Sequence, residues 1–215
     1  MSRPQSKNSK NPLALAVLAL LAERPMHPYE MGVLLRQRHK EESIKLRYGS
    51  LYTVIEFLLK EDLIIARETA REGRRPERTV YELTPSGAAR LRAWMADLLA
   101  RPVKEYPQLE AALCFLPVLP PEEALPLLRQ RLHTLEQSVA ALSGQMQGLG
   151  DLPPLFLVET EYRLALLKAE RAFVADLVGR IAQGWGPLDL WRGFHEDREA
   201  TLAKLYGQYG GGPMT

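Results

Sequence analysis

The sequence predicts a mainly α-helical fold with one small β-hairpin, in which a winged helix-turn-helix domain precedes a C-terminal helical domain with long antiparallel helices. Two observations support this prediction. Within residues 1–100, three helical patterns are followed by two short strand patterns and a fourth helical pattern. Along residues 101–215, leucines recur at helical spacing. We therefore expect a flexible polar tail over residues 1–10, a winged-helix domain over residues 11–100 and a helical domain over residues 101–215.

Three helices are predicted at the start of the winged-helix domain. Asn11 is a favourable cap for a helix that reaches about Glu23. A second helix is expected over about residues 28–38, and a third from about Tyr48. The apolar residues of the third helix recur three and four positions apart, as on one buried helical face: they are Leu51, Val54, Ile55, Leu58 and Leu59.

A change to strand-like composition and alternating spacing predicts a β-hairpin. Residues 63–69 are rich in strand-forming side chains, and residues 79–84 alternate between apolar and polar positions. A fourth helix is expected over about residues 88–100. The turn between the strands carries four arginines, Arg71, Arg74, Arg75 and Arg78. Because four guanidinium groups on one solvated turn repel each other, we interpret them as ligands for an external anion, with a merely soluble loop as the alternative.

Charge is distributed unevenly along the chain. Residues 1–100 carry 17 Lys and Arg against 12 Asp and Glu, whereas residues 101–215 carry 11 against 14. A basic first half and an acidic second half favour a polyanionic partner, such as nucleic acid, for the first half alone.

Three segments resemble a known family of DNA-binding proteins. Residues 48–64, YGSLYTVIEFLLKEDLI, are similar to the recognition-helix signature of PadR-family transcriptional regulators, with Asp62 where the family often has glycine. Residues 73–87, GRRPERTVYELTPSG, resemble the family's wing and end on its Tyr-x-Leu-Thr-x-x-Gly pattern. Tyr29-Glu30 resembles the family's Gly-Tyr-Glu, with His27-Pro28 in place of the usual small residue and glycine.

This resemblance covers about residues 12–100 and continues more loosely to about residue 185. It implies a transcriptional regulator, with residues 11–100 as the DNA-binding domain. In the winged-helix form of the helix-turn-helix, the third helix enters the major groove of double-stranded DNA, and the hairpin tip follows the backbone or the minor groove.

The residues expected to bind DNA lie around the start of the third helix and on the hairpin turn. Tyr48 and Ser50 occupy a helix N-terminus, where free backbone amides and the helix dipole favour a phosphate. Lys45 and Arg47 precede the helix and are expected to reach phosphates or base edges. For Tyr52, two interpretations stay open: a hydroxyl that donates to the DNA backbone, or a core ring with its hydroxyl at the surface. The four turn arginines complete the set.

The second half of the chain carries the clearest helical periodicity. After Pro120-Pro121, apolar residues recur in steps of three and four over more than three heptads, as in a helix packed along another helix: Leu125, Leu128, Leu132, Leu135, Val139, Leu142, Met146 and Leu149. Another long helix is expected over residues 155–183, with two apolar stripes. One stripe comprises Leu157, Leu164, Leu167, Val174, Val178 and Ile181, and the other comprises Tyr162, Leu166, Ala169, Phe173 and Leu177.

A helix with two apolar faces needs two neighbours. The preceding helix covers one face, and we expect a second copy of the chain to cover the other, which makes residues 101–215 a dimerisation domain. A two-fold homodimer presents two recognition helices about one DNA turn apart to a roughly palindromic operator. Residues 186–215 are expected to add one more short amphipathic helix.

The resemblance also implies a small-molecule effector, because PadR relatives include repressors released by phenolic acids or by flat, hydrophobic drugs. Aromatic side chains that stack on planar ligands are available for such a pocket: Trp94, Tyr106, Phe115, Tyr162, Phe173 and Trp191, with Met95 and Trp185 in addition. That these are ordinary packing residues is the alternative.

Other classes of function are not expected. The chain has no nucleophile elbow, P-loop or dinucleotide fingerprint, so neither an enzyme nor a cofactor is predicted. Its histidines show no metal-ligand spacing, and its single cysteine, Cys114, is interpreted as a small core residue. The longest apolar run, Leu13 to Ala22, falls short of the ~20 residues of a membrane span, and we expect a cytoplasmic protein. The remaining alternative is a protein-interaction adaptor that keeps a winged helix and binds a partner through its coiled helices.

Overall fold

The computed structural model describes residues 11–67, 79–149 and 152–209, so the predicted tail over residues 1–10 lies outside the described residues. The chain divides into two compact units, Met1–Glu105 and Tyr106–Thr215. Each unit has its own cluster of buried apolar side chains. The sequence analysis places the boundary after residue 100, whereas the contacts place it after Glu105.

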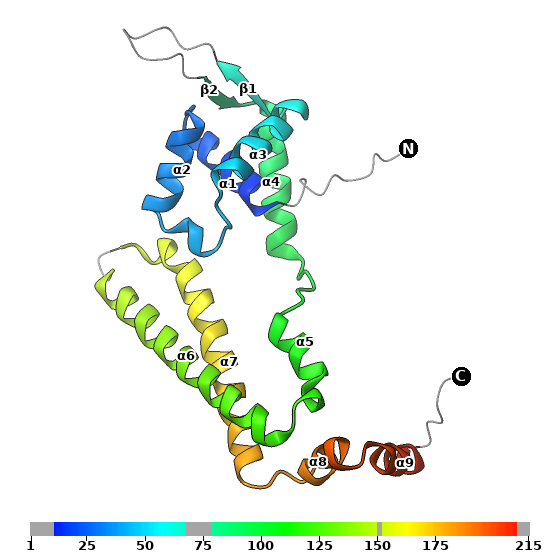
Figure 1. Cartoon of the computed structure of the whole chain (residues 1–215). Coiled ribbons are helices and arrows are strands. Elements are labelled where there is room, and N and C mark those ends of the chain that lie inside the picture. Colours follow the sequence, from blue (N-terminus) through cyan, green and yellow to red (C-terminus); the bar gives the residue numbers. More distant parts are fainter. Residues whose placement is uncertain (1–10, 68–78, 150–151, 210–215) are drawn as a thin grey trace. The chain divides into compact units, whose positions relative to one another are not determined.

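The first unit has the predicted order of helix, helix, helix, hairpin and helix (Figure 1). Its elements are α1 (Pro12–Glu23), α2 (Pro28–Gln37), the short 3₁₀ helix η2 (Lys40–Glu42), α3 (Tyr48–Lys60), β1 (Ile64–Arg67), β2 (Val80–Leu83) and α4 (Pro85–Ala100). The fourth helix begins earlier than the predicted residue 88, because Pro85 fits its first turn.

Side-chain caps define where three of these helices begin. The Asn11 carboxamide oxygen accepts a hydrogen bond from the Leu13 amide at 3.0 Å, and a ring nitrogen of His27 accepts from the Tyr29 amide at 3.1 Å. The Thr84 hydroxyl accepts from the Gly87 amide at 2.9 Å. In α1, α2 and α4 the capping residue is followed by proline. The missing N–H of proline costs nothing at the first helical position, because that N–H would have no partner within the helix.

The core of the first unit forms around α1, which is buried on nearly all sides. Leu13, Val17 and Leu18 are almost completely excluded from solvent, and α1 packs against both α3 and α4. The buried side of α3 consists of the residues predicted from its spacing, of which Leu59 alone is only partly buried. Burial of this apolar surface is the main favourable term that holds the unit together.

The two strands form an antiparallel hairpin in which Ile64 pairs with Leu83 and Arg67 pairs with Val80. A third segment joins it, because the backbones of Met26 and Tyr81 exchange two hydrogen bonds of 3.1 Å. Strand β2 is thus paired on both sides near Tyr81. The hairpin is attached to the chain segment that leads into α2.

The junction of α3, the hairpin and α4 is held by hydroxyl groups and a close backbone approach. The Thr84 and Ser86 hydroxyls both donate to the Asp62 carbonyl, at 2.8 and 2.9 Å. Asp62 has a φ of +54°, in the left-handed region that favours glycine, which is the residue that the resembling family often has there. A Cβ at Gly87 would lie 2.0 Å from the Leu63 carbonyl oxygen, so only glycine fits at this point of α4.

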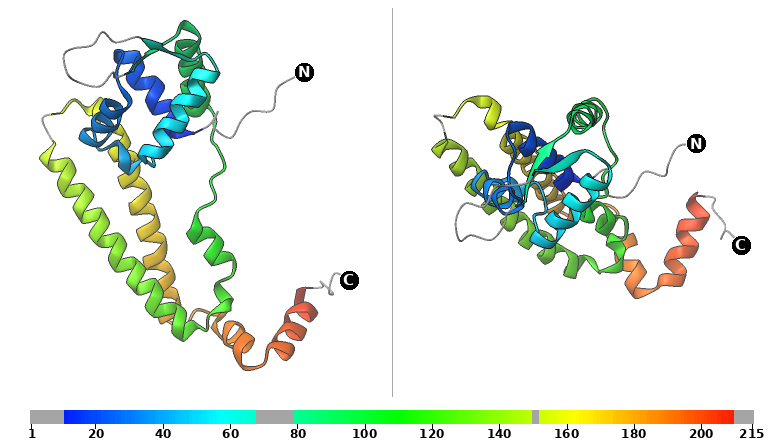
Figure 2. Two further views of the ribbon diagram at one scale, coloured as in Figure 1. Left: turned by 45° about the horizontal axis from the view of Figure 1, so that its top comes forward. Right: turned by 90° about the horizontal axis from the view of Figure 1, so that it is seen from above.

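The second unit is built on a pair of long antiparallel helices. Its elements are α5 (Gln108–Cys114), the 3₁₀ helix η3 (Leu116–Val118), α6 (Pro121–Gly148), the 3₁₀ helix η4 (Pro154–Phe156), α7 (Val158–Ala182), α8 (Leu188–Glu196) and α9 (Arg198–Tyr209). Helices α6 and α7 run side by side along most of their lengths (Figures 1 and 2). None of the described helices is both long and apolar enough to cross a membrane.

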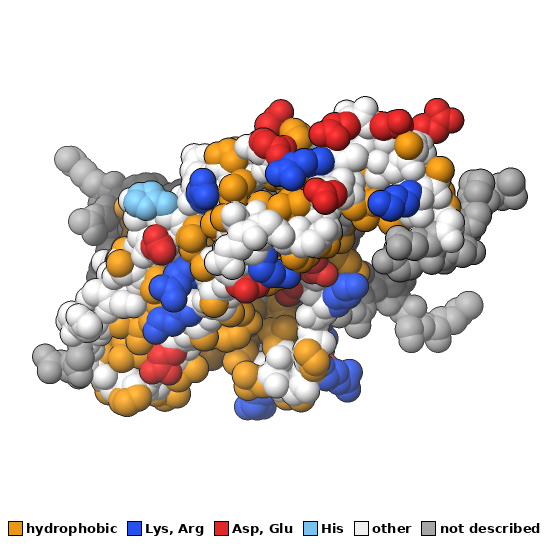
Figure 3. All heavy atoms as spheres, turned by 90° about the horizontal axis from the view of Figure 1, so that it is seen from below, with side chains coloured by type: hydrophobic (Ala, Val, Ile, Leu, Met, Phe, Trp, Pro, Cys, Tyr) orange, Lys and Arg blue, Asp and Glu red, His pale blue; other side chains and the backbone are white. Residues whose placement is uncertain are grey.

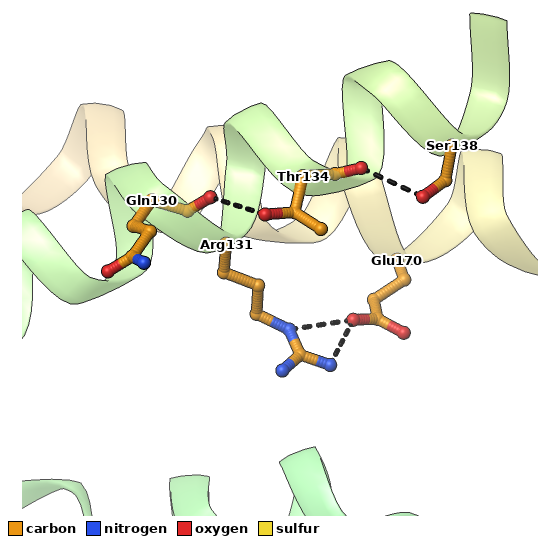
Figure 4. A network of polar contacts seen from close by, with 5 residues as sticks. All are labelled: Gln130, Arg131, Thr134, Ser138 and Glu170. Carbon is orange, nitrogen blue, oxygen red and sulfur yellow. Dashed lines mark hydrogen bonds and ion pairs between the residues drawn. The ribbon is translucent and has the colours of Figure 1, made fainter. Parts of the chain in front are cut away.

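The facing sides of α6 and α7 contain the predicted α6 stripe and most of the first predicted α7 stripe. Leu177, predicted as part of the second α7 stripe, is instead 3% exposed and lies in the same core. On α6, the stripe from Leu125 to Met146 is buried or half-buried throughout, and only its last member, Leu149, is exposed. Glu170 of α7 accepts a hydrogen bond of 2.8 Å from Nε of Arg131 on α6, which adds a polar link across the pair (Figure 4). Along α6, the hydroxyls of Thr134 and Ser138 donate to carbonyls one turn earlier.

The C-terminal segment forms two helices, whereas the sequence analysis predicts one. The chain leaves helical geometry at Asp197, whose carboxylate accepts from the Ala200 amide at 3.0 Å and so starts a new helix. Helix α8 is anchored to the start of α6: the Trp191 indole donates to the Leu119 carbonyl at 2.7 Å, and Arg192 pairs with Glu122 at 2.8 Å. Helix α9 packs on α8, where Thr201 lies against Gly193.

Gly87→Ala is expected to destabilise the first unit, because the added methyl group would overlap the Leu63 carbonyl oxygen. Such overpacking costs about 1–3 kcal/mol. Urea unfolding of the full chain, followed by far-ultraviolet circular dichroism, measures the loss. Gly49→Ala in the same unit is the control: an added Cβ there has nothing within 4 Å, and stability should change by less than about 1 kcal/mol. Equal midpoints for the two variants would contradict this packing.

Candidate nucleic-acid interface

Helix α3 has one buried face and one outward face. Leu51, Val54, Ile55 and Leu58 are at most 2% exposed. The positions opposite them, which are exposed, are Gly49, Tyr52, Thr53, Glu56 and Lys60. Gly49, Thr53, Glu56 and Lys60 are four and three positions apart and form a single line along the helix, which we call the outward line. This line is the surface that α3 can present to a groove.

The N-terminus of α3 differs from those of the other three α-helices in the unit. Arg47 occupies the capping position, and its guanidinium has no acceptor atom with which to cap; it makes no capping hydrogen bond within the described chain. The first backbone amides of α3 therefore keep their capacity to bind an anion, and the helix dipole adds to it. Lys45, Arg47 and Ser50 are all exposed around this end. The side chain of Tyr48 lies outside what the structure describes.

Tyr52 is 49% exposed, so its ring is not part of the core. On the neighbouring strand β2, burial raises the pKa of the Tyr81 phenol, and the nearby Tyr52 and Glu56 raise that pKa further. Tyr81 therefore stays protonated at neutral pH. The base of the hairpin and the outward face of α3 are thus neighbours, as an interface that uses both requires.

Four residues of this face are absent from the predicted DNA-binding set: Gly49, Thr53, Glu56 and Lys60. Thr53 is exposed, and its hydroxyl donates to the Gly49 carbonyl at 3.0 Å. The sequence carries a signal for all four, because they are the positions on the side of the helix opposite the predicted apolar stripe.

The four hairpin arginines, Arg71, Arg74, Arg75 and Arg78, lie outside the described residues. The described part of the hairpin contributes Arg67, whose guanidinium pairs with Glu82 across the strands at 2.6 Å. Both side chains are solvent-accessible, so this pair contributes little to stability.

The six candidate effector residues do not share one environment. Trp94 belongs to the core of the first unit, where it is 9% exposed, with the Arg90 guanidinium 6.0 Å from its ring centre. Trp191 belongs to the core of the second unit. The other four are exposed on the second unit: Tyr106 and Phe115 flank α5, and Tyr162 and Phe173 lie on α7. For the two tryptophans, ordinary packing accounts for the burial.

Cys114 is exposed at the end of α5, so its interpretation as a core residue is wrong. Helix α5 reaches the core of the second unit through Leu109 and Leu113, which are four residues apart. The next residue points about 100° away around the helix, toward solvent. The described residues contain no cluster of three metal-ligating side chains.

The comparisons with known proteins agree with this geometry. Residues 17–93, which span α1 to most of α4, match the family model described as the transcriptional regulator PadR-like family. Over these residues, the chain is similar to the PadR-like family, whose model describes transcriptional regulators. No curated protein matches the chain significantly.

Solved structures share the PadR-like fold at low sequence identity. Bacillus subtilis PadR in complex with operator DNA is 20% identical, with a TM-score of 0.62 over 80% of this chain and 99% of that one. The same protein in complex with p-coumaric acid is 17% identical, with a TM-score of 0.62 over 83% and 99%. The PadR-like regulator BC1756 from Bacillus cereus is 12% identical, with a TM-score of 0.55 over 80% and 98%.

Proposed function

We propose that this PadR-like regulator is a homodimeric, sequence-specific repressor that binds a roughly palindromic operator through α3. The carrying observation is the construction of α3, which has a cationic residue without a capping hydrogen bond at its N-terminus, and an outward face of small or polar side chains opposite a buried apolar face. The first feature suits a phosphate, and the second suits the floor of a major groove. The operator complex of Bacillus subtilis PadR supports the same role for this chain.

Phosphate contacts in this proposal come from two places. Lys45, Arg47 and Ser50 surround the start of α3, and the four hairpin arginines follow from the resemblance of the wing. Such contacts position the protein on the duplex and supply most of its non-specific affinity. Sequence is read by the outward face of α3, with Tyr52 beside it as a donor to the backbone.

The homodimer is supported by an apolar face on α7 that no described element covers. Helix α7 packs on α6 through Val174, Leu177 and Ile181. The predicted second stripe stays largely exposed: Tyr162 is 66%, Leu166 53% and Phe173 45% exposed. Hydrophobic side chains occupy wide areas of the surface drawn in Figure 3. Exposed apolar surface of this extent marks an interaction site, and we assign this stripe to a second copy of the chain.

An aromatic effector is the last part of the proposal. The complex of Bacillus subtilis PadR with p-coumaric acid supports a planar acid as its chemical class. The exposed aromatic side chains of the second unit offer rings for stacking: Tyr106, Phe115, Tyr162 and Phe173. An effector that releases the operator must bind the DNA-free form more tightly than the DNA-bound form.

Lys45→Ala and Arg47→Ala are each expected to weaken binding to operator and unrelated duplexes by similar factors. The slope of log affinity against log salt is negative, and each lost phosphate contact should make it shallower by about 0.9. Mobility-shift titrations on the DNA upstream of the protein's own gene, at about 50 and 200 mM salt, measure both effects. Arg129→Ala on α6, which removes an equal charge from the second unit, should leave both unchanged. Equal effects of all three changes would argue against the interface.

Leu166→Glu is expected to convert the dimer into a monomer, because it places a charge in the centre of the assigned interface. Chromatography with light scattering at micromolar concentration reports the mass. Ala175→Glu introduces the same charge nine residues later, half a turn around α7 on another exposed position, and should leave the dimer intact. A wild-type chain that runs as a monomer would refute the dimer.

Adding p-coumaric acid is expected to weaken operator binding and to quench tryptophan fluorescence. Trp94→Phe and Trp191→Phe identify the responding unit, because the two indoles lie in separate cores. Loss of quenching in only one variant locates the effector near that tryptophan. If a panel of planar aromatic acids changes neither fluorescence nor operator affinity, the chain has no effector of this class.

A further inference from the structure

Glu56 places a carboxylate on the outward line of α3. Its side chain is exposed, two turns after Gly49 and about one turn after Thr53. The opposite side of the helix at this level is filled by buried Ile55 and Leu58. Any duplex that receives this face therefore meets Glu56. A negative charge in that position repels phosphates, and its presence needs an explanation in terms of the groove.

Within the described part of the chain, Glu56 has no basic partner. Among the described residues, no lysine or arginine forms an ion pair with Glu56. The neighbouring groups are two phenols: the charge of Glu56 contributes to the raised pKa of Tyr81, as does Tyr52. The carboxylate oxygens of Glu56 can therefore accept hydrogen bonds from an external donor.

The shape of the outward line brings this acceptor close to the base edges. Gly49 has no side chain, and Thr53 is short and tied to the Gly49 carbonyl by its hydroxyl. Glu56 is therefore the first long side chain on the line, about 10 Å along the helix axis from Gly49. The first turns can approach the duplex closely while the carboxylate extends beyond them.

Ionised carboxylates only accept hydrogen bonds, and two bases offer donors in the major groove. Adenine presents its N6 amino group beside the N7 acceptor, which would face the second carboxylate oxygen. Cytosine presents its N4 amino group without an acceptor on the same base. We propose that Glu56 is a specificity-determining residue that accepts a hydrogen bond from the N4 amino group of a cytosine in each half of the operator. This inference rests on the proposed function, in which α3 enters the major groove.

The test is selection of binding sites from a random duplex library by purified full-length protein. Wild type is expected to enrich cytosine at one position of each half-site, with a preference of roughly 5- to 150-fold over the other bases. Glu56→Gln is expected to shift that position toward adenine, because a carboxamide both donates and accepts and so matches adenine N6 and N7. Glu56→Ala should lose the preference there and bind unrelated DNA at least as tightly as wild type.

Glu61→Gln is the matched control, because it removes the same charge from an exposed residue just past the end of α3. It should keep the wild-type cytosine preference. The assignment of Glu56 fails if both Glu56→Gln and Glu56→Ala select the wild-type sequence. In that case unrelated DNA should also bind Glu56→Gln and Glu61→Gln with equal affinity. That result leaves the proposed function standing, whereas a wild type that enriches no sequence overturns both the proposed function and the assignment of Glu56.

Discussion

The first unit depends on the burial of one face of α3. Leu51, Ile55 and Leu58 complete a core centred on α1, and the chain continues directly into Ile64, which belongs to the same core. Because a helix has a fixed periodicity, burial of these residues also determines which residues face outward. The composition of the outward line, from Gly49 to Lys60, is therefore a consequence of core packing.

The second unit depends on the same principle, with a different outcome. Helix α7 has two apolar faces, and the unit provides a partner for one of them, α6. Solvation of the second face is unfavourable, since Tyr162, Leu166 and Phe173 expose large apolar areas. On the outward line of α3 the exposed residues are polar or small, whereas on the second stripe of α7 they are apolar. This contrast distinguishes a face suited to nucleic acid from one suited to protein.

Local patterns predicted the elements whose limits depend on local interactions. Asn11 caps α1 through its own side chain, and the α6 stripe follows directly from helical spacing. Features that depend on distant residues were not predictable in this way. The pairing of Met26 with Tyr81 and the anchoring of Trp191 to Leu119 join segments far apart in the chain. The residues of the outward line could have been predicted from the sequence, because they lie opposite the apolar stripe of α3.

The attachment of β2 to Met26 has a mechanical consequence. A hairpin that pairs with no other segment can pivot at its base. In this hairpin, strand β2 is hydrogen-bonded to β1 on one side and to Met26, which precedes α2, on the other. A pull on β2 would be passed through Met26 to the entrance of α2, so the described part of the hairpin should move together with the helix-turn-helix.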